Sequence, residues 1–299
     1  MTVARAQVGS NGNREAEIVK RLNDFWEQIP RDDCETSLIP GLEPEARELV
    51  RTNPFAFLLA ASLDRGTKVE IIWTLPYWLQ QALGHLDPCR IAQMSEGDIR
   101  AVLERLPKKP RYINAVPRTI VSLARMVCDE FHGDATRLWD GGIALETMQK
   151  FREIYGVGDG IAAMLVILLD QLGMARFSDP YNIPVKPDSH VIRVMVRLGL
   201  IPPQSTEQDA VAKARALKPD YPGALDSPLW YIGRKFCHSI SPACAECPLN
   251  DLCPRVGVCG YSNFRPDLCC TLELDNHGYT KLRCPSELRL SCRHHTGSG

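Results

Sequence analysis

Residues 151–199 decide the fold of this chain and read FREIYGVGDGIAAMLVILLDQLGMARFSDPYNIPVKPDSHVIRVMVRLG. Within them Gly156, Val157 and Gly158 separate two segments of apolar periodicity, and the second, 161–172, has a helical pattern. Two glycines around one aliphatic residue permit a tight turn with positive φ and a close approach of the backbone to an outside group. Because the turn leads into a helix start, where unpaired N–H groups and the helix dipole favour an anion, the pattern predicts a phosphate-binding turn.

The same stretch places a carboxylate at the start of another helix. Asp188 comes directly before a segment with one apolar face, formed by Val191, Val194, Met195 and Leu198. An aspartate here can be an N-cap, a catalytic group or both, because a cap holds the side chain where a substrate arrives. A phosphate-binding turn followed by such a carboxylate indicates a protein that handles DNA.

Four cysteines near the end of the helical region have the spacing of a metal centre: Cys237, Cys244, Cys247 and Cys253. Thiolates so close in sequence can enclose a 4Fe–4S cluster. A four-thiolate zinc site is the alternative, although zinc sites more often pair two Cys-x2-Cys knuckles and only one is present here. Free thiols are a third interpretation. Disulfides are not expected, because a chain of this kind belongs in a reducing compartment.

Together these motifs resemble the helix-hairpin-helix DNA glycosylases of the endonuclease III superfamily. The segment 154–158 is similar to the family hairpin, 185–198 to the segment that carries the catalytic aspartate, and the cysteine spacing to the 4Fe–4S loop. The resemblance extends from about residue 14 to residue 254. It implies an all-α, two-lobed fold, with a helical barrel lobe and a 4Fe–4S cluster lobe, and a base-excision-repair enzyme that flips a damaged or mispaired base out of double-stranded DNA.

The resemblance also implies roles for individual residues. Asp188 is the expected catalytic carboxylate, which stabilises the positive charge that develops on the sugar and activates water. Arg65 stands where many members have a glutamine that fills the gap left by the flipped base, although it can equally be a surface arginine. The remaining DNA contacts are expected from the hairpin and from a basic loop: Gly156, Val157, Gly158, Gly160, Lys108, Lys109 and Arg111.

Two details bear on the reaction. Arginine at the gap-filling position is similar to the thymine/uracil mismatch glycosylases, which makes thymine or uracil opposite guanine the leading substrate. Bifunctional members carry a Schiff-base lysine where this chain has Gly160, so a monofunctional enzyme is expected. Lys186 is the other nearby amine. A bifunctional glycosylase/AP lyase and a catalytically silent DNA-binding scaffold stay open as alternatives.

Composition limits the remaining possibilities. The 299 residues are 44% hydrophobic, enough for a sizeable core, and the net charge is −1, so positive charge for DNA has to be local. Between Arg100 and Arg125, seven basic residues stand against one acid. With no membrane-length apolar run and no signal region, we expect an intracellular, soluble monomer, in the cytoplasm or nucleoid or in a nucleus.

The expected organisation has four parts. Residues 1–13 are polar and are expected to be disordered. The barrel lobe with the hairpin spans 48–165, and 14–47 join 166–256 in the cluster lobe. Residues 257–299 form a Cys-rich extension without a recognisable metal spacing.

Overall fold

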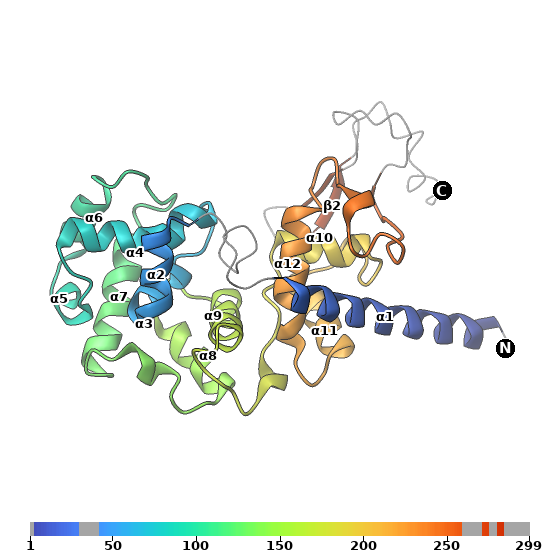
Figure 1. The fold of residues 1–299 in the computed structure, drawn as a ribbon, viewed down its shortest axis with the longest axis horizontal. Coiled ribbons are helices and arrows are strands. Elements are labelled where there is room, and N and C mark those ends of the chain that lie inside the picture. The colour runs from blue at the N-terminus through green and yellow to red at the C-terminus, as the bar shows by residue number, and fades with distance from the viewer. Residues whose placement is uncertain (1–2, 30–41, 259–270, 275–279, 284–299) are drawn as a thin grey trace. The chain divides into compact units, whose positions relative to one another are not determined.

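The computed structural model of this chain describes residues 3–29, 42–258, 271–274 and 280–283, with side chains from residue 12 to residue 258 within those ranges. The regular secondary structure of the described residues is helical apart from one short antiparallel strand pair, β1 (Thr271–Leu274) with β2 (Thr280–Arg283), in which Thr271 pairs with Arg283. The prediction of an all-α fold is therefore confirmed for the glycosylase-like part of the chain, and Figure 1 shows its helices.

The chain forms two compact units, 29–183 and 1–28 with 184–299. The chain passes from one unit to the other after residue 28 and returns after residue 183, whereas lobe boundaries were expected near residues 48 and 166. The N-terminal helix α1 (Val3–Gln28) begins earlier than its composition suggests, since residues 3–13, expected to be disordered, are helical. A helix that is anchored further along, here by the fully buried Ile18 and Leu22, propagates at little cost into polar residues.

The unit of residues 29–183 is a group of helices around two almost wholly apolar ones. In α3 (Pro54–Ser62) every residue from Phe55 to Ser62 is buried, and Asn53 caps its start through the Ala56 N–H. In α9 (Asp159–Gln171) residues 161–169 are buried. Surrounding them are α2 (Pro44–Thr52), α4 (Val69–Leu83), α5 (Pro88–Ala92), α6 (Glu96–Leu103), α7 (Val116–Asp129), η1 (Ala135–Leu138), α8 (Ala144–Glu153) and η2 (Pro180–Asn182).

The second unit packs α1 on the helices that follow residue 184. Its core joins Ile18 and Leu22 to apolar side chains from α10 (Ser189–Arg197), α11 (Glu207–Leu217) and α12 (Asp226–Lys235). Helices α10 and α12 lie side by side, and η3 (Pro222–Leu225) leads into α12 (Figure 1). The cysteine loop with η4 (Cys244–Glu246) follows α12. Cys259, Cys269, Cys270, Cys284 and Cys292 lie outside the described residues.

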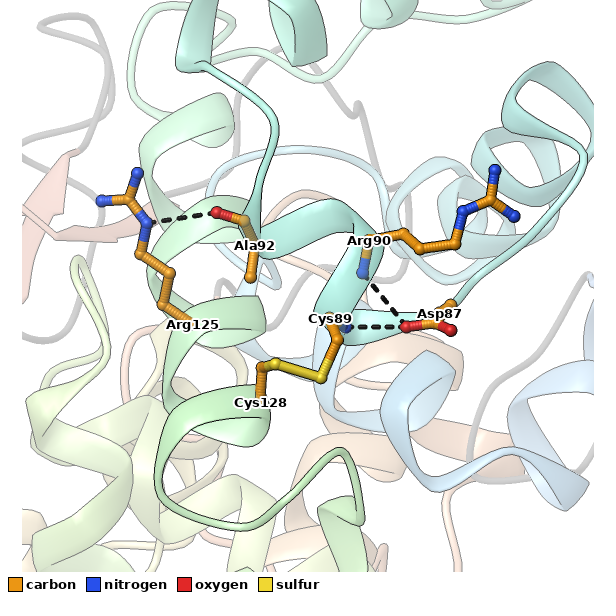
Figure 2. The surroundings of a disulfide bond; sticks show 6 residues. All are labelled: Asp87, Cys89, Arg90, Ala92, Arg125 and Cys128. Carbon is orange, nitrogen blue, oxygen red and sulfur yellow. Dashed lines mark hydrogen bonds between the residues drawn. A yellow bond between two sulfur atoms is a disulfide. The ribbon is translucent and has the colours of Figure 1, made fainter.

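One prediction about the cysteines is wrong. Cys89 of α5 and Cys128 of α7 form a disulfide, with their Cα atoms 4.9 Å apart, and Figure 2 shows the bond joining the two helices. Asp87 caps α5 and Arg125 of α7 donates to the Ala92 carbonyl, so the bridge lies within an already bonded helix pair. The expectation came from the usual redox state of such proteins, whereas the packing of α5 on α7 brings together two cysteines 39 residues apart. A crosslink of this span stabilises a fold by about 4 kcal/mol in the chain-entropy model.

Within the described residues, no helix combines the length and the apolar character that a membrane crossing requires.

Candidate functional site

The predicted hairpin is formed by residues 154–158, between α8 and α9. Gly156 has φ of +84°, in the region that favours glycine, and the Val157 N–H donates to the Ile154 carbonyl at 3.0 Å. Val157 is 6% exposed and anchors the turn in the core. Gly158, with φ of −100°, is the N-cap of α9, and a Cβ placed on it would meet nothing within 4 Å. The N–H groups of the first turn of α9 therefore start from an open surface, as a phosphate site requires.

Arg65 lies on this hairpin. Its Nη1 donates to the Gly156 carbonyl at 2.6 Å and its Nη2 to Thr119 Oγ1 at 3.3 Å. A Cβ added at Gly156 would stand 2.5 Å from Nη1, so the absence of a side chain there is what admits the guanidinium. Arg65 and Gly156 are 91 positions apart in the sequence and were expected to make separate DNA contacts. In the structure they are hydrogen-bonded to each other.

The two residues after Gly158 decide which charge and which reactive group lie beside the hairpin. Asp159, with an 87% exposed side chain, pairs with Arg152 at 2.6 Å, and this pairing offsets a negative charge beside the expected phosphate. Gly160 follows in the first turn of α9 and has no side chain. The position that holds a Schiff-base lysine in bifunctional enzymes therefore has no amine here.

The predicted basic run between residues 100 and 125 does not form one patch. Arg100 pairs with Glu104 at 3.1 Å, and Arg118 and Arg125 line a surface cavity of about 660 Å³ together with acids. That cavity lies beside the hairpin and is lined by Glu96, Arg118, Val121, Ser122, Arg125, Met126, Asp129, Glu130, Glu153 and Tyr155. The loop residues Lys108, Lys109 and Arg111 are exposed, and the Arg111 N–H donates to Thr67 Oγ1. That these three residues contact phosphate stays a prediction.

The aromatic residues of α4 differ in how deeply they are buried: these are Trp73, Tyr77 and Trp78. Trp73 is 1% exposed and packs edge-on against Phe57 with ring centroids 5.7 Å apart. Tyr77 and Trp78 are half-buried. Trp73 therefore belongs to the core and does not line an open pocket.

Asp188 is the N-cap of α10, as its position predicted. Its Oδ1 accepts both the His190 N–H at 2.8 Å and the Val191 N–H at 3.0 Å. The cap uses one carboxylate oxygen only, so it orients the group without requiring Oδ2. A half-buried carboxylate fixed at a helix start has the preorganisation that stabilisation of a developing positive charge requires.

Helix α10 connects Asp188 to the cysteine loop through two buried arginines. Arg193 is 7% exposed, and it donates from Nε to the Cys237 carbonyl at 2.7 Å and from Nη2 to the Gly233 carbonyl at 2.8 Å. Its Nη2 also lies 2.9 Å from His190 Nδ1. Since a guanidinium only donates, Nδ1 is an acceptor and the imidazole is neutral. Burial, the largest cause, lowers the pKa of His190 in agreement with this, although the charge of Asp188 raises it.

Arg197 stands at the cysteines themselves. Only 1% exposed, it donates from Nη1 to Cys237 Sγ at 3.3 Å and from Nη2 to the Ser239 carbonyl at 3.0 Å. Cys253 Sγ donates to the Arg197 carbonyl at 3.2 Å. The Nε of Arg197 is buried and has no acceptor within the described part of the chain. An anionic group beside Cys237 would supply one.

The four predicted ligands are free thiols that act on one another electrostatically. Cys237, Cys244, Cys247 and Cys253 are half-buried, and burial raises the pKa of Cys247 to about 11, with Cys237, Cys253 and Cys244 adding to the effect. The pKa values of Cys244 and Cys253 rise for the same first cause, and Cys237 contributes to each. Four adjacent thiolates need the positive charge of a metal centre, and the two arginines offset the negative charge that remains.

The donor set fits an iron–sulfur cluster. Among the described residues, no three His, Cys, Asp or Glu side chains surround a point where a single ion could be held. A four-iron cluster gives each thiolate its own iron, so its ligands do not have to meet at one point. A cluster bound by these cysteines would crosslink the loop and supply the charge that keeps the ligands as thiolates.

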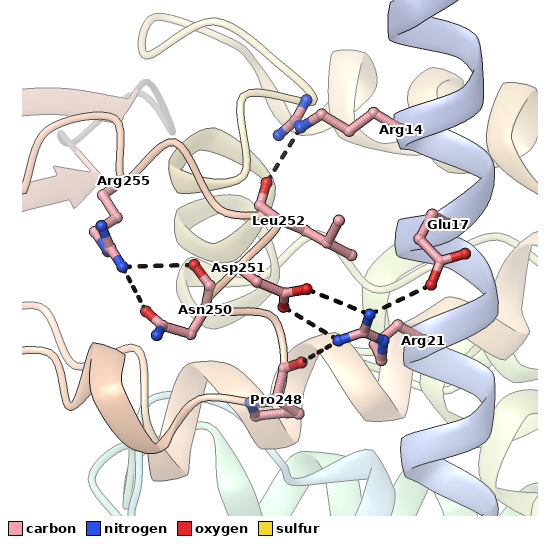
Figure 3. Close-up of polar contacts among 8 residues, drawn as sticks. All are labelled: Arg14, Glu17, Arg21, Pro248, Asn250, Asp251, Leu252 and Arg255. Atoms are coloured by element: carbon pink, nitrogen blue, oxygen red, sulfur yellow. Dashed lines mark hydrogen bonds and ion pairs between the residues drawn. The ribbon is translucent and has the colours of Figure 1, made fainter.

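Helix α1 holds the far side of the cysteine loop, as Figure 3 shows. Arg14 donates from Nε to the Leu252 carbonyl at 3.1 Å, and Arg21 pairs with Asp251 at 3.1 Å. Arg255 donates to Asn250 Oδ1 at 2.6 Å within the loop. Sequence reasoning missed these arginines and those of α10. Arg193 and Arg197 carry a usable signal, because they stand four apart among apolar residues of an amphipathic helix, where a charge has to have a buried partner.

Comparisons with known proteins agree with this geometry. Residues 237–253 match the model of the iron-sulfur binding domain of endonuclease III. Endonuclease III of Bacillus subtilis is 26% identical over 212 residues, covering 69% of this chain and 83% of the relative. Thymine-DNA glycosylase of Aeropyrum pernix is 25% identical over 214 residues, covering 67% and 82%. A solved non-covalent endonuclease III–DNA complex superposes with a TM-score of 0.58 at 19% identity, covering 81% of this chain and 95% of that one, and so shares the fold.

A helical fold with a glycine hairpin, an aspartate-capped helix and a four-cysteine loop defines a helix-hairpin-helix protein that carries a 4Fe–4S cluster. The matched cysteine loop and the curated relatives extend that likeness from the fold to the cofactor. The chain thus resembles the endonuclease III superfamily in its fold, its cysteine loop and its most similar relatives.

Proposed function

We propose that this chain is a monofunctional DNA glycosylase of base excision repair that acts as a monomer on double-stranded DNA inside the cell and removes thymine or uracil opposite guanine. N-glycosylase activity on DNA follows from the superfamily and its curated relatives. The observation that carries the proposal is Asp188, a carboxylate held at the start of α10 with one oxygen outside the cap.

The reaction assigns a separate task to each unit. In residues 29–183, the hairpin N–H groups at the start of α9 hold a phosphate of the backbone. In residues 184–299, Asp188 stabilises the positive charge that builds on the sugar as the N-glycosidic bond breaks, and it activates the water that completes the hydrolysis. The cluster, when bound, holds the cysteine loop together behind α10.

The substrate proposal depends on Arg65. A guanidinium has five N–H donors, and two of the nitrogens of Arg65 are engaged with Gly156 and Thr119. To fill the gap left by a flipped base and bind the orphaned guanine, Arg65 has to exchange these partners for the base. Arginine binds guanine O6 and N7 well, so a mismatch that leaves guanine unpaired supplies the best replacement.

One experiment tests substrate and product together. The holoprotein is incubated with duplexes that contain thymine or uracil opposite guanine, adenine opposite an oxidised guanine, or an oxidised pyrimidine, and strands are analysed before and after alkali. We expect base release from the mismatches, an intact strand that breaks only after alkali, and no adduct trapped by borohydride, because Gly160 offers no amine. Activity on adenine alone would contradict the substrate. An adduct that disappears in Lys186→Ala would contradict the monofunctional product and leave the glycosylase intact.

A double substitution tests the DNA-binding role of the loop. Lys108→Ala with Lys109→Ala should weaken binding to all duplex sequences alike and reduce the slope of log K against log salt by about one for each phosphate that the protein no longer neutralises. The matched control is Arg51→Ala with Arg137→Ala, which removes equal charge from two exposed arginines of the same unit that pair with Glu48 and Asp134. The control should keep the wild-type slope. Equal slopes in all three proteins would mean that the loop faces solvent in the complex.

A further inference from the structure

A second carboxyl lies behind Asp188. Asp226, the first residue of α12, is 7% exposed, and its Oδ1 accepts the Lys186 N–H at 2.5 Å. The Lys186 carbonyl in turn accepts the Asp188 N–H at 2.8 Å. Asp188 Oδ1 then accepts the first N–H groups of α10. Hydrogen bonds therefore run without interruption from α12, through the backbone at Lys186, to the cap of α10.

We propose that Asp226 is a positioning residue for Asp188: its buried carboxyl holds the backbone at Lys186 and so determines where the Asp188 carboxylate stands. Pro187 stiffens the link, because its ring restricts φ between the two bonded residues. Further along the helices, Arg193 of α10 donates to the Gly233 carbonyl of α12 at 2.8 Å. Helix α12 is thus hydrogen-bonded at two places: to α10 through Arg193, and, beside Asp188, to the residues that lead into α10 through Asp226.

The charges around Asp226 are few. Burial raises the pKa of Asp226 to about 7, the negative charge of Asp188 adds to this, and the N–H and the charge of Lys186 oppose it. From the face of α10, His190 is neutral and Arg193 is bonded to backbone carbonyls. On α12 itself Arg234 and Lys235 lie over the rings of Trp230 and Tyr231. Helix η3 has no ionisable residue, and α1 presents Phe25 and Trp26 to Tyr231.

Protonation of Asp226 should therefore affect the site. Below about pH 7 the Asp226 carboxyl is neutral. Above about pH 7 the ionised Asp226 adds a negative charge beside Asp188, and we expect the repulsion to displace Asp188 from its cap. Because the folded pKa exceeds the ordinary value of 3.8, the folded state also loses stability as the pH rises from about 4 to about 7.

Only the rate measurements in this test rest on the proposed function. The test therefore also includes a measurement that requires no catalytic activity. Asp226→Asn keeps an oxygen that accepts the Lys186 N–H and cannot ionise, whereas Asp226→Ala loses the acceptor. Asp209→Asn is the matched control, since Asp209 caps α11 through Thr206 in the same unit. Three quantities are measured on each holoprotein: hydrogen exchange of the peptide that contains Lys186, duplex affinity, and single-turnover base release. The rate is followed between about pH 5.5 and about pH 8.5, the range in which Asp226 titrates.

We expect Asp226→Ala to exchange faster at Lys186 and to release base about a hundredfold more slowly at unchanged DNA affinity, because a small misplacement of a reacting group has effects of that size. The wild-type rate should fall as the pH passes about 7, whereas Asp226→Asn should keep its low-pH rate without that fall. A wild-type rate in Asp226→Ala, or the same fall in Asp226→Asn, would overturn the proposal. If Asp226→Ala does not fold, the pH profile of Asp226→Asn decides.

Failure of the proposed function can be distinguished from failure of the proposal that Asp226 positions Asp188. If the wild-type protein releases no base from any duplex, faster exchange at Lys186 in Asp226→Ala, with wild-type exchange in Asp226→Asn and Asp209→Asn, still supports the positioning of the loop. Unchanged exchange in Asp226→Ala would overturn it whatever the activity.

Discussion

Asp188→Asn is expected to bind duplex DNA as the wild-type protein does and to release base about a hundredfold to a thousandfold more slowly. Asparagine keeps an oxygen that accepts the His190 and Val191 N–H groups, so α10 keeps its cap. It loses the negative charge that stabilises the sugar cation, and a preorganised electrostatic contact of this kind contributes about 3–4 kcal/mol to the barrier. Single-turnover base release beside a binding isotherm measures both quantities.

The chain offers a closely matched control for that substitution. Asp87 caps α5 with the same geometry, accepting the Cys89 and Arg90 N–H groups on one oxygen. Asp87→Asn should therefore change neither binding nor base release. A wild-type rate in Asp188→Asn would mean that the aspartate is only a cap and would favour the interpretation as a DNA-binding scaffold.

Cys244→Ser is expected to lose the brown colour and most of the iron, which in anaerobically purified wild-type protein should amount to about four irons per chain. The loss should also loosen the loop that follows α12, because the cluster would crosslink its four cysteines, whereas the arginine hydrogen bonds hold it at single points. Iron analysis, the visible absorption spectrum and limited proteolysis of the loop measure the effect.

The matched control is the other pair of cysteines. Cys89→Ser with Cys128→Ser should keep the full iron content and colour, since both sulfurs lie in the unit that does not hold the loop. Its cost should appear as a decrease in thermal stability, about 4 kcal/mol by the chain-entropy model. Stoichiometric zinc without iron in anaerobically purified wild-type protein would contradict the cluster.

Two buried arginines of α10 connect the expected effect of Cys244→Ser to that of Asp188→Asn. Arg193 and Arg197 lie on the helix that Asp188 caps, and both bond to the start of the cysteine loop. Loss of the cluster is therefore expected to loosen the loop segment that holds acceptors of two buried charges on the helix that carries the candidate catalytic group. Unpaired buried charges are costly, so α10 has to move or admit water.

Several elements could be predicted because local chemistry decides them. A helix forms where apolar residues recur at its period, which is why the segment 161–172, predicted to be helical, lies almost wholly in α9. The hairpin needs a positive φ and has Gly156 there, and Asp188 caps a helix because its side chain reaches the N–H groups two and three residues on. Each of these depends on residues within one or two turns of chain.

Local chemistry did not reveal the contacts between distant residues. Arg65 could be aligned with a gap-filling position, yet its bond to Gly156 exists only because α3 and α7 bring the loop to the hairpin. Disulfides were not expected, on the basis of compartment, yet Cys89 and Cys128 form one because their helices pack together. The arginines of the run 100–125 looked alike in sequence, and ion pairs and the acidic cavity then distinguished them.

The helices, the hairpin, the four-cysteine spacing and the carboxylate at the start of α10 could be predicted, because spacing along one short segment is enough to build each of them. The groups that stand behind them come from the fold: Asp226 lies 40 residues after Lys186, whose N–H it accepts, and Arg14 bonds to a loop 238 residues away. The physical reason is that a contact at such separation is formed by the packing of whole helices, and no single segment carries the information on which side chain will meet it.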